Sequence, residues 1–430
     1  MIDLQYATAT YGSHQETIRL MEMGDNFRYG IQCPKDVQKA FSLYDEVEGI
    51  LNSFEGRCAG LSPYIHMRMC ECYLYGIGTD KNLLKAFTSL IKFAHYLRHL
   101  PFVAKTYDVA VDTNFQSFEM AAEELLTNIN NHFREYGFLI RLDNNSLRVF
   151  SKFRIPFQIN KNKHPEHMLL KTVIQQSLIY FPTLWFGTVL HGRYGTTDPK
   201  KSFYDAENIL FYNLDLASAE ATKKCRNICF STISPDEIIA QQRAYNVPEE
   251  LCHFYEYFAD PAAHEQNQRE VLVAQWKKLP FSPVKSDSSV LDHWIAMRGI
   301  SDQIESLGSV DTKGGEQFSV YMEIETPQDG YVKILSVLKP LVDAIISALH
   351  GGDFSEDQLR FFTKKLSVPD NWIINNTNNI LGKRQYIQRY PSKSGIKWNP
   401  ADDLCGKVSI ITKEGEGWKL CGRIYKIENQ

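Results

Sequence analysis

Apolar residues recur at helical spacing through most of the first 135 positions of this chain. They fall three or four positions apart between residues 37 and 51, and again after residue 83, so that each window gives one apolar helix face. The first series is Val37, Ala40, Phe41, Tyr44 and Val47, and the second is Leu84, Phe87, Ile91 and Ala94. A third helical stretch, residues 115–133, can cap the array. We therefore expect an all-α module over residues 1–135.

The first two series belong to a segment that the chain repeats. Tyr29-Gly30-Ile31, Lys35 and Lys39-Ala40-Phe41 return 46 residues later as Tyr75-Gly76-Ile77, Lys81 and Lys85-Ala86-Phe87. Each Gly stands where a chain leaves a helix with positive φ, and each Ala is small enough for two helices to approach closely. The repeat predicts two helical hairpins that share one kind of turn.

This pattern resembles the Sel-like (SLR) helical repeat, a relative of the TPR, over about 100 residues. The resemblance implies a stacked surface that holds a partner protein rather than a reaction centre. The expected partner contacts are exposed positions around the two turns, namely Arg28, Lys35, Asp80 and Lys81. The alternative is a chance match between two ordinary helical hairpins.

From residue 136 onward the pattern is mixed. Strands are expected over residues 147–159, 184–190, 206–214, 227–232, 318–325, 408–413 and 418–427. Helices are expected over residues 166–181, most of 235–278, 331–349 and 358–366, with Ser234-Pro235 as a helix start. The predicted fold is α+β and multidomain, with an antiparallel or mixed sheet. The predicted domains are 1–135, 136–305 and 306–430.

Two pairs of acids are candidates for a magnesium site. Asp205 and Glu207 precede an apolar run, and Asp402 and Asp403 stand immediately before a predicted strand. Magnesium prefers hard oxygen ligands and suits phosphodiester hydrolysis. If the fold brings these four carboxylates together, they are the catalytic and metal-binding groups of an alternative, Mg²⁺-dependent function.

These acids, together with Lys339-Pro340-Leu341-Val342-Asp343-Ala344, are similar to the motifs of RusA-type Holliday-junction resolvases. The resemblance implies a metal-dependent nuclease. However, Leu335 and Ser336 stand where that family has its Asp-x-Asp-Asn motif before the Lys-Pro motif. A diverged, inactive copy and a coincidence are therefore the competing interpretations.

A basic and aromatic segment near the C-terminal end is the strongest nucleic-acid signal. Its cations and rings are Lys383, Arg384, Tyr386, Arg389, Lys393, Lys397 and Trp398. Cations contact phosphates, and flat rings stack on bases. The alternative is a solvated loop beside a strand.

Two short clusters give weaker metal or catalytic signals. His164-Pro165-Glu166-His167 carries three ligand types, but a proline between the histidines argues against one shared helix face. Cys252 and His253 are neighbours in a region predicted to be helical, where adjacent side chains point apart. The nine cysteines form no doubled CxxC pattern, so we expect reduced thiols and no metal or other cofactor.

Overall charge and hydropathy narrow the function classes. The net charge of −4 gives no global attraction to nucleic acid or to an anionic membrane. No secretory signal is visible, and the apolar stretch 169–190 contains Lys171, Gln175 and Gln176, so we expect no membrane span. The leading hypothesis is a cytoplasmic, bacterial interaction or adaptor protein. By analogy only, it could belong to a multi-protein defence system.

Overall fold

The computed structural model divides the chain into two compact units, residues 1–182 and 183–430. It describes residues 15–53, 61–106, 114–143, 146–156, 163–179, 189–201, 209–210, 213–214, 227–260, 270–280, 289–328, 334–352, 354–369, 371–384, 387–389 and 396–428. The chain is α+β, as expected. The division at residue 182 differs from the boundaries after 135 and 305 that the sequence pattern favours, because residue 305 lies within a strand that pairs with an earlier one.

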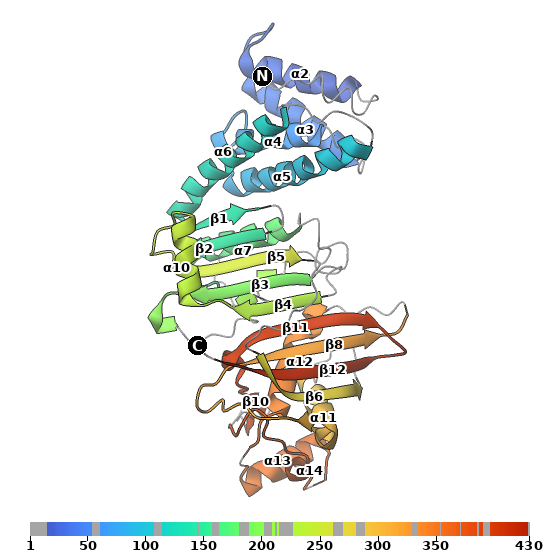
Figure 1. The fold of residues 1–430 in the computed structure, drawn as a ribbon. Coiled ribbons are helices and arrows are strands. Elements are labelled where there is room, and N and C mark those ends of the chain that lie inside the picture. Colours follow the sequence, from blue (N-terminus) through green and yellow to red (C-terminus); the bar gives the residue numbers. More distant parts are fainter. Residues whose placement is uncertain are drawn as a thin grey trace. The chain divides into compact units, whose positions relative to one another are not determined.

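Five helices of the first unit pack in chain order (Figure 1). They are α2 (Gln15–Tyr29), α3 (Val37–Ser53), α4 (Ser62–Tyr75), α5 (Leu83–Thr106) and α6 (Asn114–Glu135). Apolar positions of the two hairpins α2–α3 and α4–α5 are buried at the same offset of 46 residues, as in the pairs Met21 and Met67, Ala40 and Ala86, and Val47 and Phe93. The predicted apolar series is confirmed in part. Its buried members are Ala40, Tyr44, Val47, Phe87 and Ile91, and its partly exposed members are Val37, Phe41, Leu84 and Ala94.

A short β-hairpin continues the first unit after α6. Strands β1 (Phe138–Leu142) and β2 (Ser146–Ser151) pair antiparallel, and α7 (Pro165–Ile179) packs against α5. The buried side chain of Asn130 exchanges two 2.9 Å hydrogen bonds with the backbone of Ile140, and Phe133 stacks on Phe138. These contacts fix β1 to the last helix of the array, which makes the β-hairpin part of the helical unit.

Replacing Gly76 with alanine should lower the free energy of unfolding of the full chain by about 1–2 kcal/mol, because its φ of +74° is a left-handed conformation that a Cβ opposes. Gly49 lies exposed inside α3, and no atom of the described residues lies within 4 Å of an added Cβ. Gly49→Ala should therefore raise the same free energy by roughly 0.5–1 kcal/mol. Urea denaturation followed by circular dichroism measures both changes. Equal effects of the two variants would contradict the left-handed turn.

The second unit is built on a mixed sheet with strand order β5-β3-β4-β11-β8-β12-β6-β7. Its strands are β3 (Val189–Thr196), β4 (Asn227–Thr232), β5 (His253–Asp260), β6 (Glu270–Pro280), β7 (Glu305–Ser306), β8 (Phe318–Thr326), β11 (Cys405–Glu414) and β12 (Lys419–Ile427). The pairs β3–β4 and β8–β11 are parallel, whereas β8–β12 and β3–β5 are antiparallel. Gly422 lies where an added Cβ would meet the Trp276 ring at 2.0 Å, so the bulky indole covers that glycine.

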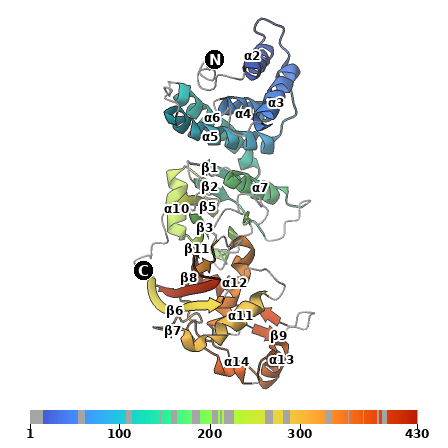
Figure 2. The same cartoon turned by 90° about the vertical axis from the view of Figure 1, so that its right-hand side faces the viewer.

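Helices cover this sheet on both faces. Figure 2 shows α10 (Pro235–Ala244) on one face and α12 (Ile334–Ala348) on the other, with α11 (Ser289–Gly299) beside α12. The helices α13 (Glu356–Leu366) and α14 (Trp372–Asn375) follow, and β9 (Ile387–Arg389) pairs with β10 (Ile396–Trp398) in a separate two-stranded ribbon. Helix α12 runs through Pro340 without a new start.

Local signals located most of these elements correctly, but two regions were wrong. Residues 209–210 and 213–214, the described part of the strand expected over 206–214, are helical. Ser234 caps α10 with a full capping box, which confirms the predicted start. The helix ends at Ala244, however, and residues 245–278, expected to be mostly helical, instead contain β5 and most of β6. Among the described residues, no helix combines the length and the apolar character that a bilayer crossing requires.

Candidate partner-docking surface

The turns of the two helical hairpins have the same backbone geometry. Gly30 and Gly76 have φ angles of 70° and 74°. After each glycine, a backbone N–H donates back to a carbonyl of the first helix over 2.8 Å, from Asp36 to Phe27 and from Asn82 to Tyr73. The repeated sequence therefore encodes two turns that present equivalent residues to solvent.

Side-chain contacts of the second helix also recur. The carboxylate of Asp36 accepts from the Lys39 N–H, and the amide oxygen of Asn82 accepts from the Lys85 N–H, at 3.0 and 2.9 Å. These bonds satisfy amide donors that a helix start would otherwise leave open. The ammonium groups of the same lysines lie over the rings of Phe27 and Tyr73, at 4.1 and 5.1 Å. Each turn is thus fixed by a side-chain hydrogen bond at the start of its second helix and by a lysine–ring contact with its first helix.

Three left-handed glycines of the array are each preceded by an exposed tyrosine, whereas the fourth, Gly78, follows Ile77. Tyr29, Tyr75 and Tyr136 are 49%, 46% and 43% exposed, and they precede Gly30, Gly76 and Gly137. The first two tyrosines each contact the helix two places further along the chain. Tyr29 in α2 has its ring 5.6 Å from the Arg68 guanidinium in α4. The Tyr75 hydroxyl in α4 accepts a 3.0 Å hydrogen bond from the Asn128 amide in α6. We refer to Tyr29, Tyr75 and Tyr136 as the tyrosine row.

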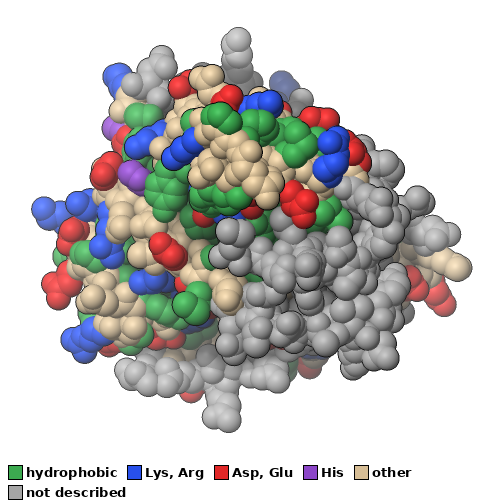
Figure 3. Space-filling model, turned by 90° about the horizontal axis from the view of Figure 1, so that it is seen from above, with side chains coloured by type: hydrophobic (Ala, Val, Ile, Leu, Met, Phe, Trp, Pro, Cys, Tyr) green, Lys and Arg blue, Asp and Glu red, His purple; other side chains and the backbone are tan. Residues whose placement is uncertain are grey.

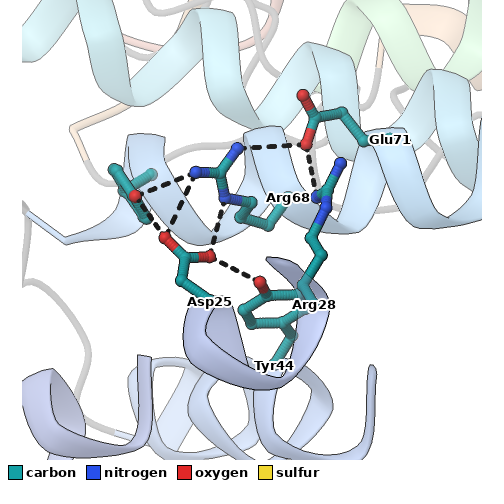
Figure 4. A network of polar contacts seen from close by, with 6 residues as sticks. Asp25, Arg28, Tyr44, Arg68 and Glu71 are labelled. Carbon is teal, nitrogen blue, oxygen red and sulfur yellow. Dashed lines mark hydrogen bonds and ion pairs between the residues drawn. The ribbon is translucent and has the colours of Figure 1, made fainter. Parts of the chain in front are cut away.

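A buried polar network lies where α2, α3 and α4 meet, in the interior of the helical array (Figure 4). The Asp25 carboxylate accepts hydrogen bonds from the Tyr44 and Tyr64 hydroxyls and from the Arg68 guanidinium. Arg68 also pairs with Glu71 at 3.2 Å, and Arg28 pairs with the same Glu71 oxygen at 2.6 Å. The members come from three helices, so the network fixes the first hairpin to the second.

The electrostatics of the network keep its guanidinium groups charged and its phenols neutral. Burial opposes the charge on Arg68, but the nearby Asp25, Tyr64 and Glu71 outweigh it and raise the pKa of Arg68. Burial raises the pKa of Tyr44, and the Asp25 carboxylate raises it further. Burial raises the pKa of Tyr64 as well, so both phenols stay protonated near neutral pH and donate hydrogen bonds to Asp25. A charge with this many donors can be retained inside a protein.

The network corrects one predicted partner contact. Arg28 is buried and paired with Glu71, so it is part of the support and not an exposed position. Lys35, Asp80 and Lys81 are exposed, as expected. The Lys81 side chain lies over Gly76, 3.1 Å from the position of an added Cβ, and Lys35 lies beside Gly30 in the same way. A tyrosine and a lysine therefore stand together at each turn.

The face seen in Figure 3 has acidic and basic side chains interspersed with hydrophobic ones. A mixed surface gives no single-sign field, so local groups rather than net charge decide what binds there.

The sequence prediction did not include the tyrosine row. A signal for it was present, since a Tyr-Gly pair occurs at all three positions.

The acids of the alternative nuclease site are only partly described. Asp205 and Glu207 lie outside the described residues. Asp402 and Asp403 are adjacent, and each has a cation: Lys339 Nζ is 3.0 Å from Asp402, and Arg384 Nη1 is 3.1 Å from Asp403. Lys339 also pairs with Asp343 at 2.7 Å. The fold thus brings the Lys-Pro segment to Asp402, in an arrangement that an ion-pair cluster explains.

The residues of the basic segment fall into three groups: some are described and make contacts, some lie on a ribbon, and some lie outside the described residues. Lys383 is exposed, Arg384 is half-buried in its pair with Asp403, and the Trp398 ring packs edge-on against the buried Trp294 at 5.8 Å. Arg389 and Lys397 lie on the two strands of the β9–β10 ribbon, opposite Ile396 and Gln388. Tyr386 and Lys393 fall outside the described residues. Two of the expected nucleic-acid contacts, Arg384 and Trp398, therefore already have structural roles.

Two clusters that looked weak in sequence converge in space. Pro165 occupies the first position of α7, where it starts the helix, so His164, Glu166 and His167 gather around one turn. Their ligand atoms lie within 4.8 Å of one another. Cys252 and His253 are not helical; with Asp198 they form a second group that meets the same limit. The helical prediction for Cys252 and His253 was wrong, whereas His164 lies outside α7 and shares no helix face with His167, as expected.

Comparison with known proteins adds no assignment to this geometry. No family model, no curated protein and no solved structure matches the chain.

Proposed function

We propose that this chain is a protein-interaction or adaptor protein whose helical hairpins form a docking surface of the SLR kind. The observation that carries the proposal is the recurrence of one exposed tyrosine and one exposed lysine at each turn, Tyr29 with Lys35 and Tyr75 with Lys81. Side chains buried at the same offset are explained by packing alone, but packing does not require exposed groups to recur.

The proposed occupant is a segment of a partner protein that carries carboxylates next to apolar side chains. The lysines offer point charges to carboxylates, and the tyrosines offer apolar rings with a polar tip, which suits an interface. Asp80 has Pro34 as its counterpart in the first turn, so that acid does not recur. The buried network beneath holds the two turns in fixed relation, which lowers the entropic cost of binding.

The double variant Lys35→Glu/Lys81→Glu should lose at least tenfold in affinity for acidic–apolar peptides selected by display on the full chain. Two charge reversals at one interface create like-charge contacts with the peptide carboxylates. Binding is measured by fluorescence anisotropy at low and physiological salt.

Lys313→Glu provides the matched control, because Lys313 is also exposed but lies in the second unit. The control should bind as the unaltered protein does. Selection of basic peptides, or equal loss in the control, would contradict the proposed surface.

Nucleic-acid binding through Lys383–Trp398 stays a prediction, and so does the Mg²⁺-dependent nuclease. The positions of Arg384, Trp398, Asp402 and Asp403 in ion pairs and ring contacts give neither of them further support.

A further inference from the structure

Two neighbouring strand ends of the second unit bring three metal-ligating side chains together. Strands β3 and β5 are antiparallel, with Thr196 opposite His253. One residue further along, the Thr197 N–H donates to the Cys252 carbonyl over 3.0 Å. Asp198 follows the residue that pairs with Cys252, and one ligand atom from each of Asp198, Cys252 and His253 lies within 4.8 Å of the others.

The side chains of Asp198, Cys252 and His253 are of the types that bind zinc in proteins. A thiolate, an imidazole and a carboxylate are its usual ligands, at about 2.0–2.3 Å, so two ligands of a tetrahedral ion lie about 3.3–3.8 Å apart. The three ligand atoms lie within 4.8 Å of one another, so a mutual approach of roughly 1–1.5 Å at most brings them to that spacing. Three protein ligands would leave a fourth position for water or another small donor, which is the pattern of open zinc sites.

The imidazole of this cluster is held in place by a second contact. His253 is fully buried, and its Nδ1 lies 2.9 Å from the hydroxyl of the buried Tyr194. Histidines that bind metals are oriented by a hydrogen bond at the other ring nitrogen, and losing such a contact weakens metal affinity. Tyr194 supplies a contact of that kind.

A cavity begins next to the cluster. It has a volume of about 480 Å³ and is lined by Thr197, Ile239, Gln242, Arg243, Asn246, Val247 and Glu249. Thr197 precedes Asp198, and Gln242 donates to the carbonyl of Leu251, which precedes Cys252. The strand ends that carry the ligands thus border a space for solvent or a small molecule.

The other group of three, His164, Glu166 and His167, is less suited to hold an ion. The His164 side chain is 53% exposed, and the group stands at the start of α7, where the helix dipole opposes a cation.

We propose that Asp198, Cys252 and His253 bind one zinc ion and leave a coordination position open toward solvent. The proposal is independent of partner docking, because all three residues lie in the second unit.

The test uses Co²⁺ as a spectroscopic probe on the full chain, followed by displacement with Zn²⁺. The unaltered protein should bind one Co²⁺ with a thiolate-to-metal charge-transfer band in the near ultraviolet, and one Zn²⁺ should remove that band. Cys252→Ser should abolish the band, and Asp198→Asn should weaken Zn²⁺ binding by about tenfold or more. Cys33→Ser, which changes a similarly half-buried free thiol in the other unit, should leave both unchanged.

A second measurement uses the unaltered protein, so its result does not depend on whether the variants fold. In the unaltered protein, Zn²⁺ should slow the alkylation of Cys252 by iodoacetamide but not that of Cys33, as quantified by peptide mass spectrometry. Absence of Zn²⁺ binding in equilibrium dialysis, unchanged Co²⁺ spectra in Cys252→Ser, or loss of binding in His164→Ala would each overturn the assignment.

Discussion

Replacing Arg68 with methionine should lower the free energy of unfolding by about 3–5 kcal/mol, the range for breaking one side of a buried ion pair. Of the described groups that contact the buried Asp25 carboxylate, the variant leaves the Tyr44 and Tyr64 hydroxyls, and it removes one of two cations at Glu71. Methionine has a similar shape to the arginine stem, so lost packing contributes little. The measurement is urea denaturation of the full chain followed by far-ultraviolet circular dichroism.

Two comparisons isolate the cause. Arg19→Met removes the exposed pair with Glu16 in α2 and should change stability little. The double variant Asp25→Asn/Arg68→Met removes both charges and should lose less than the sum of the single variants, since neither charge is then left alone. A loss of less than about 1 kcal/mol in Arg68→Met would mean that water reaches the network.

Acidification from pH 6.5 to pH 4 should destabilise the second unit by about 3 kcal/mol through His350 alone. Burial lowers the pKa of His350 to about 4, Arg384 acts in the same direction, and the hydrogen bond from Nδ1 to the Gly382 carbonyl opposes both. An unfolded histidine has a pKa near 6.5. Between these values the unfolded chain takes up a proton that the folded chain does not, so stability falls as the pH falls and is constant in this respect above about 6.5.

His350→Asn separates this effect from other acid-sensitive groups. Asparagine keeps a donor near the position of Nδ1 but does not titrate, so the variant should lose less stability than the unaltered protein between pH 7 and pH 4. His191 and His293, whose pKa values burial also lowers, contribute equally to both proteins. All six tryptophans lie in the second unit, so their fluorescence follows its unfolding. The same pH dependence in both proteins would refute the role of His350.

Local chemistry made part of the fold predictable. The positive φ of Gly30 and Gly76, and the capping box at Ser234, each depend on a few adjacent residues. Residues 253–280 form strands despite a weak helical spacing, because their pairing with other strands decides their conformation. Tyr255, Tyr257 and Trp276 are buried strand residues whose partners on β3 and β12 are distant in the sequence.

The site could be predicted less well than the fold, for a physical reason. Whether a charged residue is exposed depends on which helices meet around it. Arg28 looks like a surface arginine until α4 brings Glu71 against it from 43 positions away. Cys252 and His253 likewise become a group only when the end of β3 delivers Asp198. By contrast, the exposure of Lys35 and Lys81 follows from turns that the local sequence already specifies.

The strand order of the second unit constrains how the chain folds during synthesis. The neighbours of β8 are β11 and β12, and these also cover the otherwise open edges of β4 and β6. Until residue 427 has left the ribosome, the nascent chain exposes unpaired strand edges, which invite association with other chains. A translation stop before residue 405 should therefore yield an aggregating product rather than a smaller folded one.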